Sequence, residues 1–190
     1  MKSESSHPTA PGAPRPSDSA RRAEPWLRGT LTEVPAGQRA VLHALELARE
    51  DIARWCGTLS DSEMHARPYG LGSVAFQLRH IAGSLDRLLT YAEGNHLSAP
   101  QLKTLAEEML PEGRKEALLV TFEGGLGDAE RRIRAMDIAK WSELREVGRK
   151  KLPTTVAGLL IHCAEHTQRH VGQAITTAKI LSAMREQPST

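Results

Sequence analysis

Two histidines four residues apart, His166 and His170, lie in the segment HCAEHTQRHVGQ near the C-terminus. On an α-helix, residues spaced i and i+4 lie on adjacent turns of one face, so both imidazoles can bind one divalent ion. A third histidine, His80, lies in LRHIAGSLDR on a separate segment that we expect to be helical. A ligand from this neighbouring helix would complete a metal site that keeps open positions for water or substrate.

The same C-terminal segment carries another histidine, His162, which is a poorer candidate. Eight residues along a helix separate the Cα atoms of His162 and His170 by about 12 Å, so one ion cannot comfortably bridge them. His162 also projects about 120° from the apolar stripe of this helix. We therefore expect His166 and His170 to be the inward pair.

Cys163 and Glu165 leave two alternatives to weigh. Cys163 lies on the inward stripe, where a thiolate is a good ligand for soft metals and a thiol is also an ordinary small core residue. The segment HCAEH matches the inverted zinc-protease motif H-x-x-E-H, with Glu165 as general base. We reject the protease, because Glu165 projects opposite the apolar stripe and too little chain follows for a peptidase domain.

Helical periodicity recurs in four long stretches, and no segment alternates with period two over a convincing length. A shorter helical segment precedes Pro111, and the fourth long stretch contains no proline. The expected long helices cover about residues 36–56, 74–94, 118–136 and 156–184, and the short one covers about 99–110. The fold class predicted is all-α, a four-helix bundle with a long connection between the second and third helices. Bundles of this kind often hold metal sites between facing helices.

Three features of these elements stay open. The expected third helix contains Gly124, Gly125 and Gly127, and each glycine destabilises a helix interior by about 1 kcal/mol relative to alanine. We favour a kink or a close helix crossing as the reason for these glycines over a backbone that approaches a ligand. Residues 139–153 look like an exposed basic loop, followed by Thr154 or Thr155 as a helix cap. His80 projects about 120° from the main apolar stripe of its own helix, so periodicity alone makes it partly exposed.

Composition limits the class of protein. The chain has 190 residues, 39% apolar and 25% charged, which is typical of one domain, over residues 26–190, with a disordered tail over residues 1–25. A net charge of +2 and 4% aromatic residues give little support for nucleic-acid binding. Two cysteines outside any C-x-x-C pair, no apolar leader and no membrane span predict a cytoplasmic protein.

The segments LRHIAGSLDRLLTYAEG and AEHTQRHVGQAITTAKIL resemble the DinB-like superfamily of metalloproteins, and the resemblance extends over most of residues 26–184. Members are four-helix bundles with one histidine from the second helix and an H-x-x-x-H pair from the fourth. The resemblance implies that His80, His166 and His170 bind one divalent metal, which is zinc, nickel or iron in different members. The Gly172 and Gln173 that follow the pair fit the same pattern.

Characterised relatives include transferases and isomerases that use low-molecular-weight thiols, so the resemblance implies a metal-dependent enzyme. Our leading hypothesis is activation of such a thiol for transfer to a small electrophile. The alternatives are a metal-dependent hydrolase and a non-catalytic metal-binding or stress-related interaction module. The candidates for a general base are Glu107, Glu108 and Gln173. The expected partners are a small-molecule substrate and a second copy of the chain, with no nucleic acid and no membrane.

Overall fold

The computed structural model describes residues 23–186, so most of the expected disordered tail lies outside the described residues. Its elements are η1 (Pro25–Leu27), α1 (Ala36–Cys56), α2 (Asp61–His65), η2 (Pro68–Gly70), α3 (Val74–Ala92), α4 (Ala99–Glu107), α5 (Lys115–Ala135), η3 (Ile138–Lys140), β1 (Leu144–Val147), β2 (Leu152–Thr155) and α6 (Val156–Glu186).

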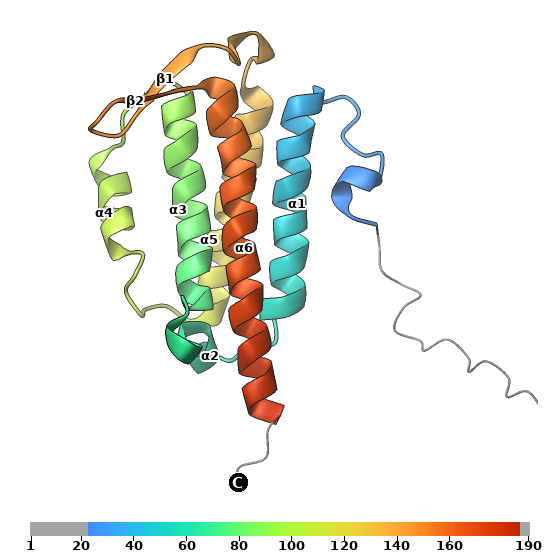
Figure 1. Ribbon diagram of the computed structural model, residues 1–190, viewed down its shortest axis with the longest axis vertical. Coiled ribbons are helices and arrows are strands. Elements are labelled where there is room, and N and C mark those ends of the chain that lie inside the picture. The colour runs from blue at the N-terminus through green and yellow to red at the C-terminus, as the bar shows by residue number, and fades with distance from the viewer. Residues whose placement is uncertain (1–22, 187–190) are drawn as a thin grey trace, which may run out of the picture.

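Four long helices pack side by side around one core (Figure 1). Helix α3 contacts α5 and α6, and α1 also contacts α5 and α6, so the four helices enclose a shared interior. Fully buried side chains come from each of them, including Leu45, Leu85, Leu126 and Leu160. The predicted all-α fold is confirmed. None of the helices in residues 23–186 has the length and apolar character needed to cross a membrane.

The two helices that carry the histidines begin at hydroxyl caps. Ser73 precedes α3, and its side chain accepts a hydrogen bond from the backbone N–H of Phe76. Thr155, one of the two threonines expected to cap the last helix, accepts the backbone N–H of Gly158. These caps satisfy N–H groups that a helix leaves unpaired in its first turn, and so fix where each helix starts.

Helix α5 continues through its three glycines without a break. A Cβ atom on Gly125 would lie 2.6 Å from the Cβ and 2.9 Å from the Cα of Ala82 on α3. Gly125 therefore allows a close crossing of α5 and α3, as expected. An added Cβ on Gly124 or Gly127 would meet nothing within 4 Å, so neither of these two is required by packing.

The expectation of a loop over residues 139–153 was wrong in part. The segment contains η3 and a two-stranded antiparallel sheet in which Leu144 pairs with Thr155 and Val147 with Leu152. Each strand has only four residues and neither is buried on one face, so the apolar alternation that marks a strand is missing. The basic cluster Arg149 to Lys151 lies in the hairpin turn, as an exposed segment.

The connection between α3 and α5 contains α4, which stands outside the four long helices (Figure 1). None of the residues of α4 itself is buried, and Leu102 and Leu105 are 46% and 42% exposed. The C-terminal cap residue, Glu108, is by contrast only 3% exposed. An otherwise exposed segment thus inserts one acidic side chain into the protein.

Candidate metal centre

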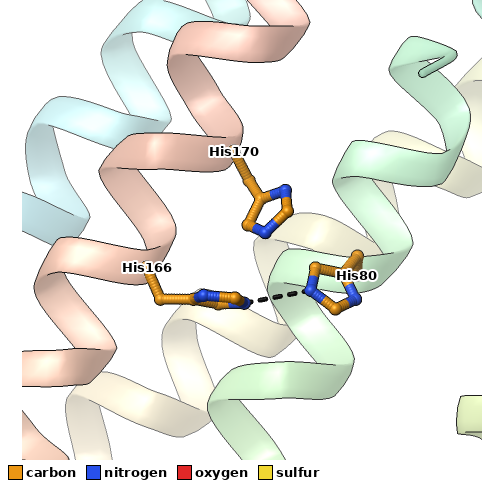
Figure 2. Close-up of side chains that lie close together, drawn as sticks. All are labelled: His80, His166 and His170. Carbon is orange, nitrogen blue, oxygen red and sulfur yellow. Dashed lines mark hydrogen bonds between the residues drawn. The ribbon is translucent and has the colours of Figure 1, made fainter. Parts of the chain in front are cut away.

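His80, His166 and His170 come together between α3 and α6, with their rings pointing toward one another (Figure 2). One nitrogen from each ring lies within 4.8 Å of the others. Nε2 of His80 and Nε2 of His166 are 2.9 Å apart. Nitrogens bound at about 2.1 Å in adjacent positions around one ion also lie about 3 Å apart, so the spacing fits a shared ion.

The packing of α6 explains why His166 and His170 face inward. Thr167, Val171 and Ala174 on this helix are buried, and His166 and His170 lie on the flank of the same face, half-buried. Both rings thereby reach the space between α6 and α3 (Figure 2).

His80 reaches the same space from α3, although it lies off the main apolar stripe. Helix α3 packs against α5 on one side and α6 on another, so a second flank is partly covered. The ring of Phe76, one turn earlier, stacks on His80 with centroids 5.4 Å apart. Phe76 therefore forms an apolar wall that limits rotation of the His80 ring.

Two of the three imidazoles have their outer nitrogen fixed by an acceptor. Nδ1 of His80 lies 2.7 Å from Oε2 of Glu108, and Nδ1 of His170 lies 2.6 Å from Oε1 of Gln77. Both acceptors place the proton on Nδ1, which leaves the Nε2 lone pair of each ring free to bind an ion. The hydrogen-bond network thus selects the tautomer that metal binding needs.

His166 completes the set with a different bonding pattern. Because Nε2 of His80 carries a lone pair, Nε2 of His166 must carry the proton in their 2.9 Å contact. Nδ1 of His166 is buried and, within the described residues, has no hydrogen-bond partner. An ion between the rings would replace this proton, and His166 would then carry its proton on Nδ1 and its lone pair on Nε2. Each of the three imidazoles can thus present an Nε2 lone pair to one divalent ion.

Glu108 is held from its second oxygen by a buried arginine. Nη1 of Arg87 lies 2.6 Å from Oε1 of Glu108, and the two side chains are 9% and 4% exposed. A Cβ atom on Gly83 would lie 2.6 Å from that oxygen and 2.7 Å from Nη1 of Arg87. The absence of a side chain at Gly83 is what makes room for the ion pair.

Burial and mutual repulsion keep two of the imidazoles neutral. Burial, helped by the charges of His170 and His80, lowers the pKa of His166 from its ordinary 6.5 to about 4. Burial also lowers the pKa of His170 to about 4, together with His80 and the guanidinium of Arg169. Neutral imidazole is the form that binds metal, so protons compete weakly for these two ligands near neutral pH.

The other candidates of the C-terminal segment lie outside this cluster. His162 faces Glu165 at 3.5 Å, and Glu165 also pairs with Arg169 on the exposed face of α6. Cys163 is fully buried in the core, where burial raises the pKa of its thiol to about 12. Within residues 23–186, the only group of histidine, cysteine or acidic side chains arranged to hold an ion is the three histidines.

Comparison with known proteins identifies the family. A family model for the DinB superfamily matches residues 44–174, which include all three histidines and most of the four long helices. The chain belongs to the DinB superfamily. Of the three clustered histidines in the matched region, one lies on the second long helix and two lie on the last.

A solved structure supports the same fold for this DinB protein. A crystal structure described as a conserved protein from Enterococcus faecalis aligns with a TM-score of 0.64 and 16% sequence identity. The alignment covers 77% of this chain and 97% of that one. The likeness at this identity concerns the fold alone. A comparison with curated proteins gave no match.

Sequence reasoning missed Gln77 and Arg87 and gave Glu108 a different role. Glu108 was a candidate general base, whereas both of its oxygens are bound, one to His80 and one to Arg87. Glu107 is exposed on α4, and Gln173 lies beside His170 on α6. The one available signal was the presence of Gln77 and Arg87 among apolar residues of α3, because buried polar groups need partners.

Proposed function

We propose that this DinB protein binds one divalent metal ion through His80, His166 and His170 and is a metal-dependent enzyme. The observation that carries the proposal is the convergence of three imidazole nitrogens within 4.8 Å, two of them with the tautomer fixed by an outer acceptor. Metal-binding histidines in proteins commonly donate their other N–H to a carboxylate or amide oxygen in this way.

The number of ligands favours a catalytic over a structural site. Structural zinc sites are closed by four protein ligands, whereas catalytic sites keep a position for water or substrate. Among the described residues no fourth side chain joins the three histidines, and the thiol of Cys163 lies in the core. This supports an enzyme over a module in which the ion only ties two helices together.

The reaction that we favour is transfer of a low-molecular-weight thiol to a small electrophile. A divalent ion in such a site deprotonates a bound thiol, or lowers the pKa of bound water to near 7, and so supplies a nucleophile at neutral pH. The side chains of this protein contribute the rest. Glu108 and Gln77 hold the rings of His80 and His170 in place, and Phe76 stacks on the ring of His80.

The thiol rather than water is suggested by the family resemblance, and a metal-dependent hydrolase is the second candidate. Zinc, nickel and iron are all compatible with imidazole ligands. The cytoplasmic location and the homodimer remain predictions.

The experiment that tests the metal site is elemental analysis of tag-free protein after dialysis, beside single alanine variants of the three histidines. We expect about one equivalent of metal per chain in wild type and less than about a tenth in His166→Ala and His170→Ala. His96→Ala is the matched control, because His96 is exposed and does not belong to the cluster. Wild-type protein that takes up no metal on reconstitution would sink the proposal.

A further inference from the structure

A pocket of about 670 Å³ borders the histidine cluster. One wall is α6 and the other is the segment that joins η2 to α3. The residues that line the pocket are Gly70, Leu71, Gly72, Gln77, Arg169, Gly172, Gln173, Thr176 and Thr177. This volume is in the range of pockets that bind small molecules.

Three of the lining side chains act directly on His170. Gln77 accepts the hydrogen bond from Nδ1 of His170, and the side chain of Gln173 acts on the same ring by raising its pKa. Arg169, the residue before His170, is close enough for its charge to lower the pKa of that imidazole. The pocket and the proposed metal site therefore share a wall, and a ligand in the pocket lies next to the cluster.

The charged and polar groups of the pocket favour an anion. Arg169 is its one charged lining residue, and no carboxylate is among the residues that line it. Glu165 accepts a hydrogen bond from one N–H group of the Arg169 guanidinium. Because a guanidinium has five N–H groups, Arg169 keeps donors for a ligand. A second guanidinium lies at the rim, where Nε of Arg67 donates to the backbone carbonyl of Leu71.

Gly172 keeps the pocket open at a cost to the helix. Glycine inside a helix destabilises it by about 1 kcal/mol relative to alanine. A Cβ atom at Gly172 would meet nothing within 4 Å, so helix packing does not require glycine there. The position faces the pocket, and a larger side chain would occupy the space that a ligand needs.

We infer that this pocket binds a carboxylate group of the small molecule that the metal site acts on, with Arg169 as the group that recognises it. The planar guanidinium matches a carboxylate through two parallel hydrogen bonds, and Gln173 offers a further N–H donor. The inference rests on the proposed function for the identity of the ligand. The binding of a carboxylate in the pocket can be tested without it.

The first arm of the test uses glutarate and the full-length protein without metal. Binding is measured by calorimetry for wild type, Arg169→Met and Gly172→Leu. We expect glutarate to bind wild type and to bind each variant at least about tenfold more weakly, the loss typical of a charge-assisted hydrogen bond or a filled pocket. Arg185→Met is the control, because Arg185 lies on the same helix with a side chain 52% exposed, against 53% for Arg169.

The second arm uses zinc-loaded protein with mercaptopropionate and its amide, mercaptopropionamide. These thiols differ only in the carboxylate, so Arg169→Met should weaken the acid about tenfold and leave the amide unchanged. Glutarate that fails to bind wild type, or binds Arg169→Met equally well, overturns the inference. If glutarate and mercaptopropionate bind through Arg169 as expected but zinc raises the affinity of neither thiol, the pocket inference holds and the thiol-transfer proposal fails.

Discussion

Helix α6 and the connection that contains α4 both contribute to the histidine cluster, but they do so by different means. Helix α6 carries two of the histidines and is anchored by ten buried residues along its length. Helix α4 has no buried residue, yet its cap residue Glu108 reaches the interior and binds His80. The proposed metal site thus depends on one well-packed element for two of its histidines and on a weakly packed one for the orientation of the third.

Among the variants that test this difference between α6 and the α4 connection, removal of the Glu108 side chain should have the largest effect. Glu108→Ala leaves Arg87 buried without its carboxylate, which typically costs about 3–5 kcal/mol of unfolding free energy. The loss of the acceptor on His80 should also lower metal affinity about 10- to 100-fold. Urea unfolding and a metal-competition titration measure the two effects.

Glu107→Ala is the matched control for this variant, because the neighbouring carboxylate is 51% exposed and pairs with Lys103 at 3.9 Å. Equal behaviour of the two variants would show that the connection does not support the site. The conservative variant Glu108→Gln separates the roles further, since an amide keeps an acceptor for His80 and loses the charge that pairs with Arg87.

A pair of leucine substitutions sharpens the contrast in packing. Leu160→Ala on α6 removes a fully buried side chain and should cost about 2–5 kcal/mol. Leu105→Ala on α4 truncates a side chain that is 42% exposed and should cost less than about 0.5 kcal/mol. Urea unfolding of both variants provides the measurement, and a large loss in Leu105→Ala would mean that α4 is held by packing after all.

The pH dependence of stability tests His166 and His170. In metal-free protein, His166 and His170 have a pKa of about 4 when folded, against about 6.5 when unfolded. The unfolded chain therefore binds more protons as pH falls below 6.5, and stability decreases until pH reaches about 4. Each imidazole should account for about 1 kcal/mol between pH 7.5 and pH 5.5.

Urea unfolding at pH 7.5 and pH 5.5 measures this effect. The double variant His166→Asn/His170→Asn should lose less stability than wild type over that interval, whereas His96→Asn should behave as wild type. A double variant with the full wild-type decrease would place the titrating groups elsewhere in the protein.

The sequence was most informative where one helix carries the whole pattern. The spacing of His166 and His170 ensures that both rings lie on one face as soon as the segment is helical. His80 needed the family resemblance, because its face became partly buried only when α3 packed between two neighbours. Whether Cys163 was a ligand or a core residue also depended on the packing of the helices, and it lies in the core.

The parts that the sequence did not predict depend on contacts between distant segments. No periodicity determines where α4 lies, so the bond between Glu108 and His80 could not be deduced from spacing. The contact between Gln77 and His170 joins residues 93 positions apart on two helices. The hairpin was missed because its strands are short and neither has a fully buried face, so they lack the apolar alternation that burial imposes.

Substitutions at Gly83 should affect the histidine cluster although Gly83 is not part of it. The residue has no functional group and does not belong to the histidine cluster, yet a methyl group there would collide with both Glu108 and Arg87. Displacing Glu108 would release the ring of His80. A mutational scan scored by metal content should therefore find Gly83 sensitive to substitution. The sensitivity would come from the space that the missing side chain leaves for Glu108 and Arg87, because glycine has no functional group of its own.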